Sequence, residues 1–337
     1  MFRLNFARRT FGSAGRVLAL ISALSAFGIT AAALQQNAPQ SGSPAQANPS
    51  SQAAPSVQAG APAEPDASGK KVIHDEAEYN AYLAAGNTPD PKERAEALES
   101  FAQKYPKSVV AGDALEQAMS AWQAAGDAVK VLEVAREVLQ ADQGNVRALA
   151  IVVALDRLSA GQGDSAALDE LCLYSTAGMR EIAMWHKPAE MTDADFASLN
   201  RQMAIIFNGG AGYCALRQQD FSQARDWYGR AVEFDASNLE NIYQLAIADL
   251  EMTPVDANGF WYCAKAIQLA RISSRTQVAG GMEEYCKPKY QAYHGSAEGW
   301  DSILGLSAAQ DSLPPDFAKG IKAAPAPPAP PVPPAQK

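Results

Sequence analysis

Apolar residues recur at spacings of one, three and four along the middle of the chain, and this rhythm predicts helices rather than strands. Residues 126–145 show the pattern clearly, because their apolar side chains share one helical face. These positions are Val131, Leu132, Ala135, Val138 and Leu139. Asp127 stands where the N-cap of this helix belongs, and the turn residues at 142–145 end it.

The same rhythm returns 93 residues later, in residues 220–238. The two stretches also share Asp at 127 and 220, Asp at 142 and 235, and Asn at 145 and 238. The later copy places Ala224, Tyr228 and Ala231 in the spacing A-x3-aromatic-x2-A, the second half of the 34-residue tetratricopeptide repeat. Gly212 lies in the helix before it, where a residue without a Cβ lets the two helices of a repeat approach closely.

In this frame the chain contains four complete units and an incomplete unit at either end. The complete units are 112–145, 146–179, 205–238 and 239–271, the opening helix is 90–106, and the closing unit is 285–305 with its turn at Gly295-Ser296. The chain thus resembles exported bacterial tetratricopeptide-repeat proteins over roughly residues 90–306. The resemblance implies an all-α fold, a right-handed α-solenoid of helix pairs.

One segment does not fit the regular period. The offset of 93 residues equals two periods of 34 plus 25, so we interpret residues 180–204 as an insertion. Within it, Pro188 is expected to end one helix. Thr192 with Asp195 forms a capping-box-like start for the next helix.

The two ends of the chain differ in composition from this middle. Residues 1–33 join a basic start to an apolar run and Ala31-Ala32-Ala33, which is typical of a cleaved signal peptide. An uncleaved membrane anchor is the alternative, and Arg8-Arg9 leaves a twin-arginine route open. Residues 34–70, almost all Gln, Ala, Pro, Ser, Asn and Gly, are expected to be a disordered linker. Residues 71–322 then form the helical repeat domain, and 323–337 a disordered proline-rich tail.

Charge and motif content narrow the classes of function. Without the four Arg of residues 1–33, the chain has 24 basic against 37 acidic residues, and the resulting net charge of −13 argues against a nucleic-acid partner. The sequence contains no metalloprotease, serine-hydrolase or nucleotide-loop motif. His74, His186 and His294 are far apart, and the cysteines lack the close pairs of a zinc site. We therefore expect no catalytic residue, no metal and no cofactor.

The resemblance implies a binding surface, because the first helices of tetratricopeptide repeats line a concave groove. The groove positions mix apolar and aromatic side chains, which suits an extended or helical peptide. The candidates are Arg147, Arg157, Tyr213, Leu216, Arg217, Tyr243 and Ile247. The family's carboxylate clamp uses Lys and Asn at positions that here hold Gly209/Tyr213 and Tyr243/Ile247, so that activity is not expected. The alternative is that these side chains only contact a neighbouring helix.

Aromatic residues gather toward the C-terminal end of the repeats. They are Phe260, Trp261, Tyr262, Tyr285, Tyr290, Tyr293 and Trp300. We favour their packing within the last units, since the terminal repeat of a solenoid must close its exposed core. The alternative is that these rings recognise cell-wall or glycan material.

The four cysteines are an even number in a chain expected to be exported. In the repeat frame, Cys172 and Cys263 lie on second helices, and Cys214 and Cys286 lie on the first helices that follow them. This register suggests the disulfides Cys172–Cys214 and Cys263–Cys286. Free thiols packed as small apolar side chains are the alternative, and the sequence alone permits three connectivities.

These observations predict a non-catalytic interaction scaffold that binds a protein or peptide in the groove. Export would place it in the periplasm or cell envelope, or outside the cell, with membrane contact only through an unprocessed signal segment. An accessory module that binds cell-wall or glycan material is the second hypothesis. An enzyme with its site in residues 180–204 is the third. Partner identity and oligomeric state are left open by the sequence.

Overall fold

The computed structural model describes residues 71–188 and 191–325, and every regular element within them is a helix. The all-α prediction is therefore confirmed for this part of the chain. The predictions for the signal peptide, for the linker at 34–70 and for the tail from 326 onward lie outside the described residues. Within the described ranges, no helix combines the length and apolar content that a membrane crossing requires.

The described chain divides into two compact units, whereas the sequence predicted one domain over 71–322. Unit 1 consists of 71–155, 184–188 and 191–199, and unit 2 of 156–183 and 200–325. Unit 1 holds α2 (Glu76–Gly86), α3 (Pro91–Lys104), α4 (Ala111–Ala125), α5 (Ala128–Ala141) and the first part of α6 (Val146–Gly161).

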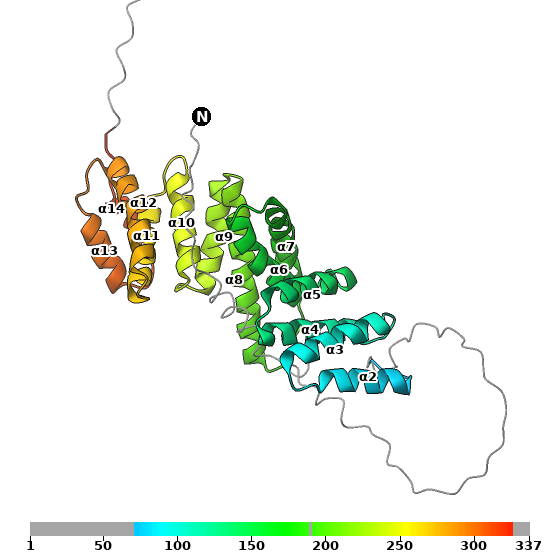
Figure 1. The fold of residues 1–337 in the computed structure, drawn as a ribbon. Helices are drawn as coiled ribbons and strands as arrows, with labels where there is room; N and C mark the ends of the chain where they lie inside the picture. The colour runs from blue at the N-terminus through cyan, green and yellow to red at the C-terminus, as the bar shows by residue number, and fades with distance from the viewer. Residues whose placement is uncertain (1–70, 189–190, 326–337) are drawn as a thin grey trace, which may run out of the picture. The chain divides into compact units, whose positions relative to one another are not determined.

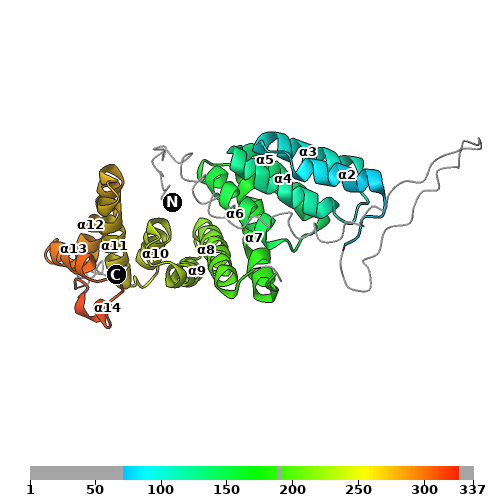
Figure 2. The same cartoon turned by 90° about the horizontal axis from the view of Figure 1, so that it is seen from below.

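Unit 2 holds the end of α6 and the helices that follow it. These are most of α7 (Ser165–Met184), α8 (Asp193–Arg217) from residue 200, α9 (Phe221–Phe234), α10 (Leu239–Glu251), α11 (Asn258–Ile272), α12 (Thr276–His294), α13 (Trp300–Ala309) and α14 (Phe317–Gly320). In both Figure 1 and Figure 2, helices α8 to α11 lie side by side in chain order. Each predicted repeat unit thus contains two helices.

The residues that recur at an offset of 93 are helix-terminus residues in both copies. Asp127 accepts the Lys130 N–H at 3.0 Å at the start of α5. Asp220 accepts the Gln223 N–H at 3.0 Å at the start of α9. Each bond satisfies one of the N–H groups that a helix leaves free in its first turn.

The shared asparagines do the same for the helices that follow. The Oδ1 atoms of Asn145 and Asn238 accept the N–H groups of Ala148 and Asn241, each at 3.0 Å, at the starts of α6 and α10. The two stretches therefore scan alike because the same side-chain caps delimit their helices.

Gly212 permits the close approach that the sequence predicted. A Cβ at this position of α8 would come within 2.8 Å of the ring of Tyr228 on α9, and that ring is fully buried. Ala215 of α8 and Ala224 of α9 belong to the same small core. The α8–α9 pair is therefore built around one aromatic ring that rests on a glycine.

The segment interpreted as an insertion is mostly helical. Its first residues extend α7 to Met184, and its last residues are the start of α8, so both helices are longer than their neighbours. The start of α8 follows the prediction, because the Asp195 N–H donates to Thr192 Oγ1 at 3.1 Å and Thr192 Oγ1 donates to Asp195 Oδ2 at 2.7 Å. Trp185, just after α7, contacts Phe196 near the start of α8, with ring centroids 5.2 Å apart.

The C-terminal end of unit 2 packs around α11. The turn predicted at Gly295 ends α12, with φ of 90° at that glycine. Lys265 of α11 is buried, and its Nζ donates to the carbonyl of Gln310 at 2.7 Å, just after α13. Ala324 donates its N–H to the carbonyl of Tyr293 at 2.7 Å. The described residues thus extend to 325, and residues 323–325 have no regular secondary structure.

Candidate functional site

Two of the groove candidates, Arg157 near the end of α6 and Tyr213 of α8, contact each other in unit 2. Arg157 crosses α8 at Gly209, where a Cβ would lie 2.9 Å from its Nη1 atom. Its guanidinium reaches Glu240 at the start of α10, with 2.9 Å between Nη2 and Oε1. The missing side chain at Gly209 therefore lets one arginine connect three helices.

Aromatic rings enclose the same guanidinium. The Arg157 Cζ atom lies 5.8 Å from the ring centroid of Tyr213 and 6.0 Å from that of Tyr228. The Arg157 side chain is only 16% exposed, so solvent screens these cation–π contacts little. Arg157 thus contacts neighbouring helices, as the alternative interpretation of the groove positions stated.

Two further tyrosines, Tyr243 of α10 and Tyr285 of α12, lie on the helices beyond these contacts. Tyr243 meets Tyr285 edge-on, with ring centroids 6.2 Å apart. The Tyr285 hydroxyl donates to Glu251 at 2.7 Å, and Lys289 Nζ lies 2.7 Å from the same carboxylate. Burial raises the pKa of Tyr243 to about 12, so its hydroxyl stays protonated at neutral pH. We call Arg157, Tyr213, Glu240, Tyr243, Tyr285 and Lys289 the tyrosine row.

The remaining groove candidates lie outside the tyrosine row. Leu216 packs against the small core around Tyr228, Ile247 is half-buried, and Arg217 is exposed. Arg147 lies in unit 1, where its Nη2 donates to Ser120 at 3.0 Å. The structure therefore brings Arg157, Tyr213 and Tyr243 onto neighbouring helices of unit 2 and places Arg147 in a different unit.

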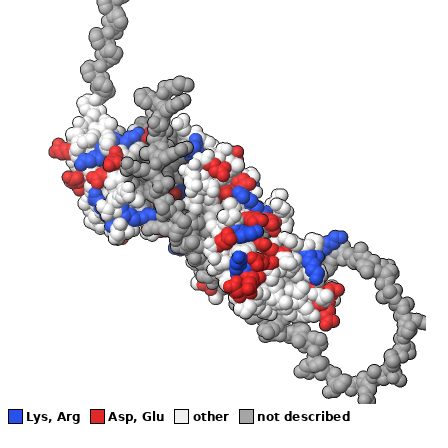
Figure 3. Space-filling view, viewed as in Figure 1, with Lys and Arg blue, Asp and Glu red and all other residues white. Residues whose placement is uncertain are grey.

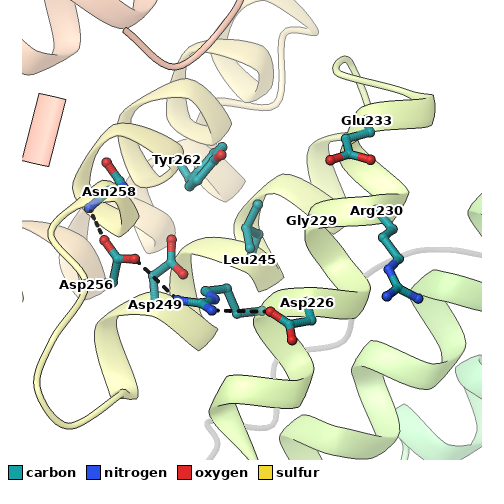
Figure 4. A pocket seen from close by; sticks show the side chains of 10 residues that line it. Asp226, Gly229, Arg230, Glu233, Leu245, Asp249, Asp256, Asn258 and Tyr262 are labelled. Carbon is teal, nitrogen blue, oxygen red and sulfur yellow. Dashed lines mark hydrogen bonds and ion pairs between the residues drawn. The ribbon is translucent and has the colours of Figure 1, made fainter. Parts of the chain in front are cut away.

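A second feature of unit 2 was missed at the sequence level. An open hollow of about 440 Å³ lies where α9, α10 and the start of α11 meet. Its lining includes Arg225, Asp226 and Glu233 from α9, with Asp249, Asp256 and Tyr262 (Figure 4). We call it the Asp249 hollow.

Asp249 is the unusual residue of this hollow. It is 1% exposed, and its Oδ1 atom has no hydrogen-bond partner among the described residues. Burial, reinforced by the neighbouring Asp256 carboxylate, raises the pKa of Asp249 to about 8, although Arg225 opposes the rise. The side chain therefore favours the neutral carboxylic acid at pH 7.

Arg225 is shared between the carboxylates at the edge of the hollow. Its nitrogens lie 3.3 Å from Asp226 and 3.7 Å from Asp256. Asp256 also accepts the Asn258 N–H at 3.0 Å, close to the start of α11. Arg225 is thus paired with two carboxylates that solvent still reaches. Asp249 is much less exposed to solvent than either of them.

The sequence carries one signal that identifies Asp249. It occupies position 11 of its repeat unit, a position that faces the partner helix and is filled by buried Ala215 in the preceding unit. Asp156 stands at the same position 93 residues earlier and is also buried. A carboxylate at a core position of a repeat is costly to bury, and this makes both residues worth singling out.

Among the C-terminal aromatics, four rings are inaccessible. They are Phe260, Trp261, Tyr290 and Trp300, each at most 2% exposed. Most of them belong to the main core of unit 2, in accord with the packing interpretation. Rings so buried cannot stack on a sugar, which leaves half-buried Tyr262, Tyr285 and Tyr293 for any such contact.

All four cysteines are paired in unit 2. Cys172 of α7 is joined to Cys214 of α8, with 5.6 Å between Cα atoms. Cys263 of α11 is joined to Cys286 of α12, with 6.1 Å between Cα atoms. This is the pairing that the repeat register suggested. Among the described residues, no group of three or more His, Cys, Asp or Glu side chains is placed to hold a metal ion.

No family model, curated protein or solved structure matched this chain in three comparisons.

Proposed function

We propose that the protein is an exported helical-repeat scaffold of the tetratricopeptide type that binds a protein or peptide along the tyrosine row. The observation that carries this proposal is the continuity of the row. Its side chains come from α6, α8, α10 and α12, and each contacts a residue of a neighbouring helix. Alternate helices that present one shared surface are what a right-handed solenoid of helix pairs would provide.

The chemistry of the row suits a peptide. Half-buried tyrosines offer large contact areas and lose little side-chain entropy when a partner binds. Their hydroxyls can form directional hydrogen bonds. The charged groups beside them are held by intramolecular pairs, so the surface is largely preorganised. A segment that supplies apolar side chains and backbone polar groups would match this mixture.

Export is part of the proposal. The composition of residues 1–33 and the two disulfides support it, because disulfides persist mainly in oxidising compartments. On the face drawn in Figure 3, Lys and Arg lie among Asp and Glu over the described helices. This mixture, together with the acidic net charge, supports a protein rather than a nucleic-acid partner.

Site-specific photocrosslinking in the producing cells tests the proposal. A benzophenone amino acid is placed at Tyr213 or Tyr243 in the row, and at Gln223, an exposed position of α9, as the control. We expect one discrete protein adduct from the row positions and none from the control. Equal labelling at all three positions would contradict the proposal. Retention of the chain on peptidoglycan with no protein adduct would favour the glycan hypothesis.

A further inference from the structure

The Asp249 hollow contains a polar group that the fold itself does not use. Asp249 lies under Gly259 of α11, where a Cβ would come within 2.8 Å of the Asp249 Cβ. This close approach of α11 to α10 removes the carboxyl from solvent. A buried polar group without a partner costs stability, so its presence beside an open hollow points to a ligand.

The charges around the hollow favour a cationic group. Four carboxyl groups line it, at Asp226, Glu233, Asp249 and Asp256, against two guanidinium groups. Arg225 is held by Asp226 and Asp256. The second guanidinium, Arg230, lies 4.8 Å from the Trp227 ring centroid, and Figure 4 shows it turned away from Asp249. Even with Asp249 protonated, three carboxylates face two guanidinium groups here, so the hollow repels an anion, and a cation would also offer Asp249 a partner.

We propose that the Asp249 hollow binds a primary ammonium group on an alkyl chain, with Asp249 as its main partner. An ammonium donates three hydrogen bonds, and its stem can lie along apolar surface while the charge reaches a buried acceptor. Leu245 and the ring of Tyr262 provide such a surface at the hollow. A lysine side chain of a partner and a free diamine share this chemistry.

Binding is expected to displace a proton. A bound ammonium stabilises the Asp249 carboxylate, so the proton that Asp249 holds at pH 7 leaves when the ligand enters. The titratable or charged groups around Asp249 come from three places. They are Arg225, Asp226, Arg230 and Glu233 of α9, Asp256 of the loop between α10 and α11, and Tyr262 of α11. Burial raises the pKa of Tyr262 to about 12, so this hydroxyl does not titrate near neutral pH. The affinity should therefore rise about tenfold per pH unit between pH 6 and pH 7.

Calorimetric titration of the full chain with its disulfides oxidised tests this inference. The probes are cadaverine, which stands for a free diamine, and Nα-acetyl-lysine amide, which stands for a lysine side chain. Acetyl-norleucine amide and N-acetylglucosamine are the neutral controls. Each titration is repeated at pH 6, 7 and 9 in two buffers with different ionisation enthalpies, which gives the number of protons released.

We expect at least one ammonium probe to bind, with release of close to one proton at pH 7 and almost none at pH 9. The probe that binds more tightly identifies the source of the ammonium group. Asp249→Asn should weaken binding at least about tenfold. The matched change Asp156→Asn, at the equivalent buried position, should leave binding unchanged.

Three outcomes would overturn the inference. They are no heat from either ammonium probe, binding without proton release at pH 7, and binding by N-acetylglucosamine with neither amine. The proton count is measured on the unaltered chain, so the test holds even if Asp249→Asn does not fold. Because the hollow shares no residue with the tyrosine row, failure here leaves the photocrosslinking result standing, and the converse also holds.

Discussion

The two units bury polar groups in different ways. In unit 1 the Glu116 carboxylate accepts a hydrogen bond from the side-chain amide of Asn145 at 2.8 Å. The positive charge of Arg147 also favours the ionised form of Glu116. Burial still raises the pKa of Glu116, but these two partners oppose the rise. In unit 2, Asp249 has Arg225 as its opposing charge and the repelling carboxylate of Asp256 beside it.

The difference extends to the whole of each unit. Among the described residues of unit 1, Gln123 is the one fully buried polar side chain, whereas Glu116 is half-buried. Unit 2 buries Asp156, Ser175, Asn208, Asn241, Asp249, Lys265 and Ser307, and it also holds both disulfides. Buried polar groups oppose folding unless they are well paired, and cross-links offset such a cost. Both of the proposed binding sites, the tyrosine row and the Asp249 hollow, lie in unit 2.

Removal of the disulfides should have the largest effect, and it should be confined to unit 2. Cys172 and Cys214 are 42 residues apart and Cys263 and Cys286 are 23 apart. The loop-closure model gives losses of about 4 and about 3.5 kcal/mol for the two bridges. Hydrogen exchange of reduced against oxidised protein should show lost protection in α7, α8, α11 and α12, and unchanged protection in α2 to α5. Four alkylatable thiols in protein made in an oxidising compartment would refute the pairing.

The pH dependence of stability should distinguish the buried Asp249 of unit 2 from the half-buried Glu116 of unit 1. Asp249 keeps its proton in the folded state up to about pH 8, while its pKa in the unfolded chain is near 3.8. The folded state therefore holds the extra proton, and stability falls as pH rises from about 4 to about 8. Between pH 5 and pH 8 we expect a loss of roughly 3–4 kcal/mol, measured by denaturant unfolding with hydrogen exchange in α10.

Substitutions of the two carboxyl residues test which group causes this change of stability with pH. Asp249→Asn should make the stability depend less on pH, because the amide does not titrate. Glu116→Gln in unit 1 should change this dependence much less, because Arg147 and Asn145 already support the Glu116 carboxylate. A slope that is identical in Asp249→Asn and the unaltered chain would show that another group is responsible.

The close approach of α8 and α9 should be sensitive to a single methyl group. Gly212→Ala places a Cβ within 2.8 Å of the buried Tyr228 ring, so we expect a loss of about 2 kcal/mol from overpacking. Gly281→Ala in the second turn of α12 meets nothing within 4 Å and should stabilise the helix slightly. Thermal unfolding of the two variants should therefore shift in opposite directions. Shifts of the same sign would mean that α8 and α9 are not packed as described.

Loss of a helix N-cap should have the smallest effect on stability, and this effect should be equal in the two units. Asp127→Ala and Asp220→Ala each remove an N-cap bond of 3.0 Å, from α5 and from α9. Each change should cost about 1 kcal/mol, because a cap acts on its own first turn. Denaturant unfolding checks this, with Asp127→Asn and Asp220→Asn as conservative controls. A cost several times larger in one unit would show that its cap has a tertiary role.

The sequence by itself determined the features that act within one or two helical turns. The apolar spacing fixed which stretches are helical, and the recurring Asp and Asn fixed where α5, α6, α9 and α10 begin. The repeat register also suggested the cysteine pairing found in the structure, because it assigned each cysteine to adjacent helices.

Only the tertiary structure decided which polar groups share an environment. The crossing of Arg157 over Gly209 and its pairing with Glu240 depend on three helices at once. The ionisation of Asp249 depends on how closely α11 approaches at Gly259. Helical periodicity reports only which face of a helix is buried. The energy of a buried charge depends on the distance to groups far along the chain and on the exclusion of water, and both are set when the helices pack.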